Sequence, residues 1–259
     1  MSGSAAASPS GFLLIDKPLG MTSMVVCASV RRRLVAGGAP TRVKVGHGGT
    51  LDPLATGLLV VLVGKYTKLC QAIMAGRKRY LAEIDLSVTS PTHDLEAPTT
   101  PVEVARPPER GRVEEVVRGF VGVIQQSPPA FSAVWVEGER AYHMAREGRA
   151  PELKPRPVTV YGIDVLGYEW PVLRLDVSCG KGTYIRSLAR DIGAALGTGG
   201  TLTALRRTES GGLGEQPFRV EDATPLDDLP RAMTQADLRV LSFTTESTEN
   251  TEREGGKGR

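Results

Sequence analysis

A glycine-rich segment around a single aspartate carries the strongest chemical signal in this sequence. Residues 46–57 read GHGGTLDPLATG, and the four glycines allow tight turns and a close approach of the backbone to a ligand. Asp52 precedes Pro53, which biases it towards extended or turn geometry. Its carboxylate either bonds nearby backbone N–H groups in a turn, or is kept ionised by neighbouring cations and acts as a nucleophile or base.

The charge around Asp52 favours the second interpretation. Asp52 is the one acidic residue between positions 17 and 82, a stretch with eleven basic residues: Lys17, Arg31, Arg32, Arg33, Arg42, Lys44, Lys65, Lys68, Arg77, Lys78 and Arg79. The net charge of the whole chain is only +3, so this excess is local. A solvated basic surface is one explanation. So many unmatched cations are more typical of a protein that binds a polyanion, most often nucleic acid.

A second cluster, CGKGTYIR at 179–186, places a glycine-flanked lysine before a predicted helix. The N–H groups at the start of a helix favour anions, so Lys181, Tyr184 and Arg186 form a candidate anion-binding turn. The same residues also suit a plain turn that opens an amphipathic helix. Tyr80, which follows two basic residues, is either a core aromatic or a stacking platform for an unpaired base.

Several other chemistries lack their sequence patterns. The segment 46–57 matches neither G-x-x-x-x-G-K-[ST] nor G-x-G-x-x-G, which argues against a nucleotide-dependent enzyme. The three cysteines and three histidines show no zinc-ligand spacing, so we expect no metal. The longest apolar run, 58–63, is far shorter than the about 20 residues of a membrane-spanning helix. Residues 1–10 resemble a flexible leader rather than a signal peptide, which predicts a cytoplasmic protein.

The elements that must position these residues alternate without a regular βαβ rhythm. Strands are predicted at 12–15, 58–63, 79–88, 158–166 and 172–179, and helices from 22 or 23 to 35 and at 113–124, 139–146 and 184–196. The segment 92–112 contains four prolines and is predicted to be a surface connection. This mixture predicts an α+β domain around one large sheet rather than a doubly wound parallel fold.

Taken in order, the motifs resemble those of the TruB family of tRNA pseudouridine synthases. The resemblance covers roughly residues 11–210. It rests on FLLIDKP at 12–18, the segment 46–57, KRY at 78–80, the stretch 89–96 with Asp94, PPAFSA at 128–133, Tyr142 with Ala145 and Arg146, KGTYIR at 181–186 and LRRT at 205–208. A chance match to the ordered set is implausible, although each motif alone is weak.

The resemblance implies a fold, a reaction and a substrate. The fold is the pseudouridine synthase catalytic fold, with one large, mixed, mostly antiparallel sheet flanked by helices and loops. The reaction breaks the N-glycosidic bond of a uridine, rotates the base and joins its C5 to the sugar. The implied substrate is the uridine conventionally numbered 55 in the T-arm of tRNA, and neither a cofactor nor a metal is implied.

The resemblance also assigns roles to residues. Asp52, Tyr80 and Arg186 are the implied catalytic residues: Asp52 attacks the base or the sugar carbon, Tyr80 stacks on the target base and is a candidate acceptor of the C5 proton, and Arg186 pairs with the carboxylate. The implied substrate-binding residues are His47, where the base has been extruded, Tyr184 and Leu205 in the pocket wall, Tyr80 again, and the cations Lys17, Lys68 and Lys181.

Four residues depart from the family pattern. Gly48 stands where threonine is common, Ser87 where a glycine is usual, and Gly180 in place of a usual serine. Trp135 replaces a common lysine, which removes a possible phosphate contact.

The predicted organisation is a leader at 1–10, one catalytic domain at 11–243 and a disordered polar tail at 244–259, which has no apolar residue. Only 51 residues follow Thr208, and without the tail they are too few for the small C-terminal RNA-binding domain that many relatives carry. We therefore expect a monomer whose catalytic domain alone supplies the affinity for tRNA. Two alternatives stay open: a non-catalytic module that binds or folds RNA, and a pseudouridine synthase that acts on another RNA.

Overall fold

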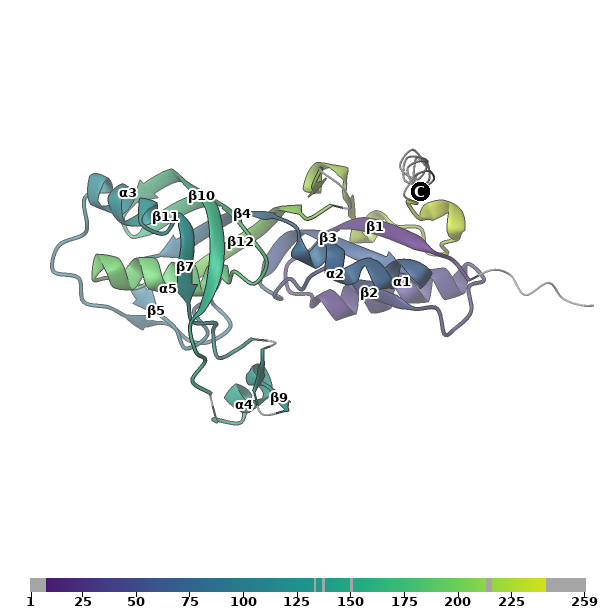
Figure 1. Cartoon of the computed structure of the whole chain (residues 1–259), viewed down its shortest axis with the longest axis horizontal. Coiled ribbons are helices and arrows are strands. Elements are labelled where there is room, and N and C mark those ends of the chain that lie inside the picture. The colour runs from purple at the N-terminus through teal and green to yellow at the C-terminus, as the bar shows by residue number, and fades with distance from the viewer. Residues whose placement is uncertain (1–7, 133, 137, 150, 213–215, 241–259) are drawn as a thin grey trace, which may run out of the picture.

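The computed structural model describes residues 8–132, 134–136, 138–149, 151–212 and 216–240 (Figure 1). The tail predicted at 244–259 and residues 1–7 of the predicted leader lie outside these ranges. Residues 8–10 lie inside them: the backbone N–H of Ser10 donates to Gln235 Oε1 over 2.7 Å, and its Oγ accepts from the N–H of Lys65 over 2.8 Å. The end of the predicted leader is therefore held against the fold.

The chain forms a mixed sheet with short helices around it. The strands are β1 (Gly11–Lys17), β2 (Val45–His47), β3 (Ala55–Val63), β4 (Lys78–Asp85), β5 (Val88–Thr89), β6 (Thr100–Pro101), β7 (Gly122–Gln126), β8 (Trp135–Val136), β9 (Glu139–Arg140), β10 (Arg156–Glu169), β11 (Val172–Cys179), β12 (Thr201–Ser210), β13 (Phe218–Arg219) and β14 (Thr224–Pro225). The α-helices are α1 (Ser23–Ala36), α2 (Cys70–Ala75), α3 (Arg110–Arg118), α4 (Ala141–Arg146) and α5 (Ile185–Leu196), and the 3₁₀ turns are η1 (Gly64–Leu69), η2 (Val220–Asp222), η3 (Leu226–Asp228) and η4 (Gln235–Asp237). None of the helices in the described ranges is long and apolar enough to cross a membrane.

One sheet of ten strands runs through the molecule in the order β14-β1-β3-β12-β4-β11-β10-β7, with β13 paired to β12 and β2 paired to β3. The β1–β14 and β3–β12 pairs are parallel, and the other pairs of this sheet are antiparallel. The prediction of an α+β fold around one large, mostly antiparallel sheet is confirmed. The strands β5–β6 and β8–β9 form two small separate hairpins.

The central strand β12 was not expected from the sequence. It runs parallel to β3 and antiparallel to β4, and so joins the two halves of the sheet. Its pairing with β4 is irregular at Leu202/Ala204 and at Arg207/Glu209, which interrupts the alternation of apolar and polar residues. The fully buried Arg207 also occupies a position where a periodicity argument expects an apolar side chain.

Three predicted elements end or begin at different residues in the structure. The helix predicted at 113–124 is wrong beyond Arg118, because α3 ends at Gly119 and residues 122–126 pair with β10 as β7. The residues Val121, Val123 and Ile124 are β-branched, which favours a strand there. The helix predicted at 139–146 begins only at 141, after β9. The strand predicted at 79–88 ends at Asp85, whose Oδ1 accepts from the N–H and the hydroxyl of Ser87, both over 2.7 Å.

Other predicted elements are confirmed. Thr22 caps α1 by accepting from the N–H of Val25, and the strand predicted at 172–179 is β11. The helix predicted at 184–196 is α5, which ends at Gly197 in left-handed geometry. The continuous apolar run in β3 is explained by burial on both faces of the sheet, since alternate residues belong to different hydrophobic clusters.

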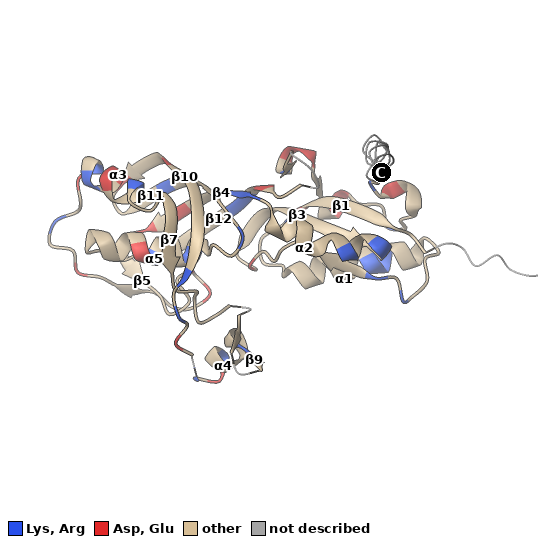
Figure 2. Ribbon diagram, in the orientation of Figure 1, with Lys and Arg blue, Asp and Glu red and all other residues tan. Residues whose placement is uncertain are grey.

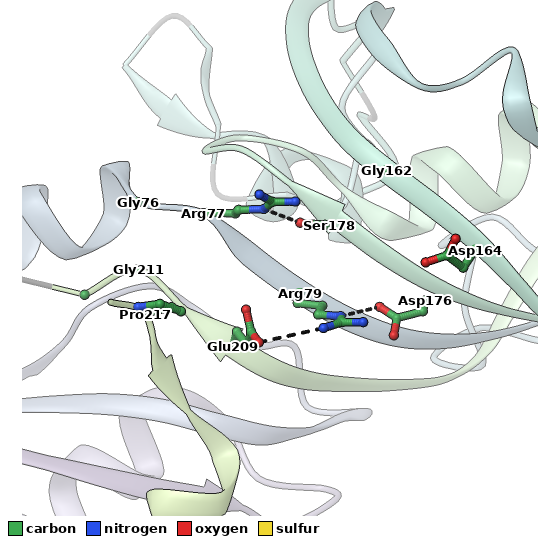
Figure 3. A pocket seen from close by; sticks show the side chains of 11 residues that line it. Gly76, Arg77, Arg79, Gly162, Asp164, Asp176, Ser178, Glu209, Gly211 and Pro217 are labelled. Carbon is green, nitrogen blue, oxygen red and sulfur yellow. Dashed lines mark hydrogen bonds and ion pairs between the residues drawn. The ribbon is translucent and has the colours of Figure 1, made fainter. Parts of the chain in front are cut away.

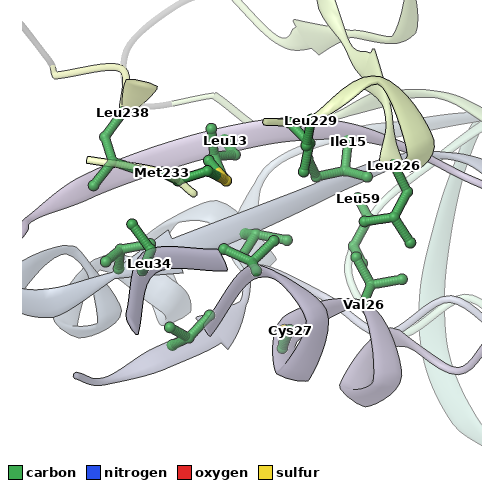
Figure 4. Packing of buried hydrophobic residues seen from close by; sticks show 14 of the residues in the cluster. Leu13, Ile15, Val26, Cys27, Leu34, Leu59, Leu226, Leu229, Met233 and Leu238 are labelled. Carbon is green, nitrogen blue, oxygen red and sulfur yellow. The ribbon is translucent and has the colours of Figure 1, made fainter. Parts of the chain in front are cut away.

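Two large hydrophobic clusters lie along the sheet, and they meet at the site described below. The first joins β1, α1 and β3 to residues 226–238, including Leu229 and Met233 (Figure 4). The second joins β4, β11 and α5 to α3. Tyr80 and Leu205 are partly buried and pack against both clusters. The junction of the two clusters therefore holds two of the residues predicted for the site.

Candidate active site

Residues from the N-terminal part of the chain hold the backbone around Asp52 through hydrogen bonds. Ser23 Oγ accepts from the N–H of Leu51 over 2.9 Å and donates to its carbonyl over 3.0 Å. The carbonyl of Pro53 accepts from the N–H of Gly20 over 2.8 Å and from Lys17 Nζ over 3.4 Å. These contacts enclose Asp52 on both sides, so its backbone is fixed while its side chain remains 38% exposed.

Lys17 also holds the loop that carries Asp52. Its side chain is fully buried, and Nζ also donates to the carbonyls of Pro18 over 2.9 Å and Met21 over 2.7 Å. Burial lowers the pKa of Lys17 to about 8, although the nearby Asp52 carboxylate opposes this shift. Backbone carbonyls enclose this ammonium group, so Lys17 helps to position the loop. Its contact with the substrate stays a prediction.

Arg207 fastens the same loop from β12, and the sequence predictions gave it no role. It is 1% exposed. Its Nε donates to the carbonyl of Leu58 over 2.7 Å, Nη1 to that of Thr50 over 3.3 Å and Nη2 to that of Gly49 over 3.2 Å. The guanidinium group therefore links β12 by hydrogen bonds to the backbone on both sides of Asp52. The motif LRRT marked this residue, but no local pattern indicated its burial.

The carboxylate of Asp52 pairs with Arg186. Arg186 Nε lies 2.9 Å from Asp52 Oδ2, and the Arg186 side chain is 6% exposed. Its Nη1 donates to the carbonyl of Thr92 over 3.2 Å and its Nη2 to that of Phe131 over 3.0 Å, so the guanidinium plane is fixed. Asp52 thus forms an ion pair with a buried guanidinium group that two backbone carbonyls hold in place.

Asp94 is a second acid at Arg186 and was missing from the predicted site residues. Its Oδ2 lies 3.5 Å from Arg186 Nε, and its side chain is 6% exposed. Asp94 Oδ1 accepts from the N–H of Glu96 over 2.9 Å, and the preceding His93 adopts a left-handed backbone with a φ of 60°. One buried cation thus lies between a partly exposed acid and a buried one. The stretch 89–96 was noted as a motif, but its sequence gives no indication of this pairing.

A shallow pocket opens at this ion pair. It is lined by Asp52, Leu54, Ala55, Asp94, Arg186 and residues 202–205. Its charged side holds the carboxylate, and its apolar side includes Leu205.

Tyr80 lies on β4 opposite Arg207 and Val177. Burial raises its pKa, with Arg207 opposing the shift, so the phenol is protonated at neutral pH. The Asp52 charge is close enough to act on the same pKa. The structure therefore places three predicted residues, Asp52, Tyr80 and Leu205, near one another from three different strands or loops.

The remaining predicted residues surround this centre at different depths. His47 lies on β2, its buried Nδ1 has no hydrogen-bond partner in the described part of the chain, and burial lowers its pKa, so the ring is neutral. Tyr184 precedes α5, and the Arg156 guanidinium lies 5.5 Å from the centre of its ring. Lys68 in η1 and Lys181 before α5 are exposed, and neither is among the described residues that line the pocket.

Another hollow lies on the opposite face of the sheet (Figure 3). It is lined by Arg77, Arg79, Asp176, Glu209 and neighbouring residues. Arg79 lies 2.8 Å from Asp176 and 3.9 Å from Glu209, so its charge is neutralised locally. Residues 79 and 80 point to opposite faces of β4, which separates this hollow from the Asp52 pocket. In the described part of the chain, no group of three His, Cys, Asp or Glu side chains could hold a metal ion.

Comparison with known proteins identifies the class of protein that has this fold and site. The model of the family described as TruB family pseudouridylate synthase (N terminal domain) matches residues 35–185, and that of the tRNA pseudouridylate synthase B C-terminal domain matches 186–241. The chain is therefore a pseudouridine synthase by fold and class, an isomerase. The second match begins at Arg186 and includes α5 and the central strand β12, so it does not mark a separate folding unit.

The relatives agree with this class. The chain is 47% identical over 224 residues to the tRNA pseudouridine synthase B of Corynebacterium aurimucosum, covering 85% of this chain and 72% of that protein. It is 40% identical over 232 residues to the protein of the same name from Phocaeicola vulgatus, covering 88% and 95%. The chain belongs to the TruB family of pseudouridine synthases.

Among solved structures, the chain is similar to one in the crystal structure of a Cbf5-Nop10-Gar1 complex, with 34% identity and a TM-score of 0.62. It is also similar to one in an H/ACA RNP bound to a substrate RNA containing 2'-deoxyuridine, with 31% identity and a TM-score of 0.59. Each match covers 85% of this chain, but the chain spans only about half the length of those proteins, 53% and 52%.

Proposed function

We propose that this protein is a tRNA pseudouridine synthase that isomerises the T-loop uridine conventionally numbered 55. The observation that carries the proposal is the ion pair of 2.9 Å between Asp52 and Arg186, in which the arginine is buried and the carboxylate is open to the pocket. The names of the curated relatives support tRNA as the substrate. Neither a metal nor a cofactor enters the proposed reaction, which is a prediction from the family resemblance.

In the proposed reaction, one bond of the nucleotide breaks and another forms. The bond between N1 of the base and C1′ of the sugar breaks, the base rotates, and C5 bonds to C1′. C5 then loses its proton and N1 gains one, so the atoms balance without an external reagent. Asp52 is the nucleophile, acting on the base or on C1′, and Arg186 orients its carboxylate through the ion pair.

Tyr80 suits the role of a stacking surface better than that of a base. Burial raises its pKa, so a phenolate is disfavoured at neutral pH. A protonated phenol ring still offers a flat apolar surface to the extruded uracil. Extrusion costs about a few kcal/mol of unstacking, which contacts with Tyr80 and Leu205 would offset.

The basic residues provide a long-range attraction for the RNA. Figure 2 marks several Lys and Arg positions in blue on the ribbon of α1, where Arg31 and Arg32 are exposed. Lys68 and Lys181 add exposed cations on η1 and before α5. We expect these residues to contact phosphates, while Lys17 and Arg207 hold the Asp52 loop.

The substitution Asp52→Asn tests the catalytic assignment. The amide keeps the shape of the side chain but cannot act as a nucleophile, so pseudouridine formation in a tRNA transcript should fall by at least about a thousandfold. The dissociation constant for tRNA should stay within about threefold of the wild-type value, because the replacement of one carboxylate oxygen by an amide nitrogen changes little of the interface. Both quantities are measured on the same preparation.

Asp16→Asn is the matched control. Asp16 also pairs with an arginine, lying 2.7 Å from Arg206, but it does not line the Asp52 pocket. It should retain nearly full activity. Undiminished product with Asp52→Asn would overturn the catalytic role and favour the non-catalytic RNA-binding alternative.

The choice of RNA needs a separate experiment. Mapping pseudouridines in all RNA from cells with and without this protein should show the loss of the T-loop modification in tRNA. Loss at a site in another RNA, with the T-loop unchanged, would favour the alternative substrate. The cytoplasmic location and the monomeric state stay predictions.

A further inference from the structure

The hairpin formed by β8 and β9 exposes a large aromatic side chain. Trp135 is 61% exposed, although indole is among the costliest side chains to leave in water. Figure 1 shows β9 and α4 standing away from the main sheet. An exposed tryptophan on a projecting hairpin has no role in the packing of the sheet, so its presence needs another explanation.

Arg140 lies over this tryptophan. The two residues are paired across the hairpin, and the Arg140 Cζ atom is 4.2 Å from the centre of the indole ring. At this distance a guanidinium group stacks on the ring and restricts its rotation. Arg140 covers one face of the indole ring. The other face is a flat surface beside a positive charge, on which an unpaired nucleic-acid base can stack.

The chain just before the hairpin is hydrogen-bonded to Arg186. The carbonyl of Phe131 accepts from Arg186 Nη2 over 3.0 Å, four residues before Trp135. Because each residue spans at most about 3.6 Å, the Cα atoms of Phe131 and Trp135 lie within about 14 Å of each other. Two backbone hydrogen bonds close the hairpin at its root. The N–H of Tyr142 donates to the carbonyl of Ser132 over 3.0 Å, and that of Ala141 to the carbonyl of Val134 over 2.8 Å.

A second connection runs from α4 to the other acid of the site. Arg146 lies 3.5 Å from Glu96, whose backbone N–H donates to Asp94 Oδ1. The hairpin and α4 are thus linked to both Arg186 and Asp94. A loop nucleotide that rests on the hairpin would sit within a short reach of the nucleotide in the pocket.

We infer that Trp135, stacked on Arg140, is a base-stacking residue that holds an unpaired nucleotide of the substrate RNA beside the reacting uridine. The inference rests on the proposed function and adds a specificity residue to it. RNA is favoured over a protein partner because the hairpin with the guanidinium–indole pair is hydrogen-bonded near its root, at Phe131, to Arg186 of the candidate site.

Fluorescence reports this contact directly. In a Trp170→Phe background, Trp135 is the one tryptophan of the chain. A tRNA transcript or a T-arm stem-loop should quench its emission on binding, because stacking on a base quenches indole. A fully paired RNA duplex of equal length should leave the emission unchanged, since it offers no unpaired base.

Substitution of Trp135 gives the second readout. Trp135→Ala should weaken binding of the transcript and raise KM by about tenfold, with kcat unchanged, and Trp135→Phe should recover most of the loss. The matched control is Tyr161→Ala. Tyr161 is 50% exposed, and the Arg77 Cζ atom lies 4.7 Å from the centre of its ring, near the hollow that Arg77 and Arg79 line. It should bind tRNA normally. Circular dichroism checks that each variant is folded.

The inference is overturned if the transcript fails to quench Trp135 and Trp135→Ala binds as tightly as the wild type. It is also overturned if the emission changes with protein concentration alone, which would assign the hairpin to contacts between copies of the chain. Failure of the proposed function looks different, since the wild-type protein would then form no pseudouridine in tRNA, whatever residue stands at 135.

Discussion

Arg186 has three fixed nitrogen contacts, and their geometry matters more than its charge. Lysine would keep the positive charge but could not reach Asp52 and the carbonyls of Thr92 and Phe131 together. Arg186→Lys should therefore slow pseudouridine formation by about 100-fold, as expected when a reacting group is displaced. The measurement is a single-turnover rate with a tRNA transcript.

Arg190→Lys, one turn later on α5, is the matched control for this prediction. Arg190 donates to the carbonyl of Ser127 over 3.2 Å and is 30% exposed. Its replacement should change the rate by less than about threefold. Equal losses in the two variants would show that α5 as a whole, and not the contacts of Arg186, determines the rate.

Burial of Lys17 makes a second residue-scale prediction, about stability. Its pKa is lowered from 10.5 to about 8, so between these values the unfolded chain binds more protons than the folded one. Stability contributed by this residue therefore rises with pH over that window, by up to about 3 kcal/mol. Urea unfolding at pH values from 7 to 10 should show that the free energy of unfolding of the wild type increases with pH relative to that of Lys17→Met. A constant difference would contradict the lowered pKa.

At the scale of elements, the parallel pairing of β3 and β12 depends on a glycine. Gly57 has a φ of 96°, and an added Cβ would lie 2.3 Å from the carbonyl oxygen of Arg207. Gly57→Ala should destabilise the protein by at least about 3 kcal/mol, from backbone strain and the separation of the two strands. Gly20 is the matched control, with a φ of 82° and nothing within 4 Å, so Gly20→Ala should cost about 1–2 kcal/mol.

Chemical denaturation of the two variants measures both costs. If Gly20→Ala and Gly57→Ala were equally destabilised, the left-handed backbone alone would explain the loss, and the contact between strands would have no part in it.

Elements with a regular pattern could be predicted from the sequence, and those shaped by distant contacts could not. The capped helix α1, the alternating strand β11 and the amphipathic helix α5 follow from local spacing. The strand β12 was missed because the buried Arg207 interrupts its apolar face. Asp94 was missed because its partner Arg186 is distant in sequence, and periodicity carries no information about such a pair. The family motifs, rather than local patterns, predicted that Asp52 and Arg186 belong together.

For the whole molecule, electrostatics should dominate the affinity for RNA. The stretch 17–82 holds eleven basic residues and one acidic residue, and Figure 2 marks part of this basic set on α1. The dissociation constant for tRNA should therefore rise at least about tenfold between about 50 and 200 mM salt. Lys68→Gln should lower the slope of log Kd against log salt by about one.

Arg118→Gln serves as the comparison for this prediction, because α3 lies at the far end of the molecule's long axis (Figure 1). It should leave the slope unchanged. Binding that is insensitive to salt would argue against a phosphate-contacting surface altogether.

The composition of the first hydrophobic cluster bears on how the protein is made. That cluster combines residues 13–63 with Leu226, Leu229, Met233 and Leu238, whereas the second is complete once residue 202 has been added. On the ribosome, the segment 13–63 must therefore wait for residues 226–238 before its interior closes. A nascent chain thus completes the hydrophobic support of the Asp52 loop only after residue 238 has been added, about 180 residues after Asp52 itself.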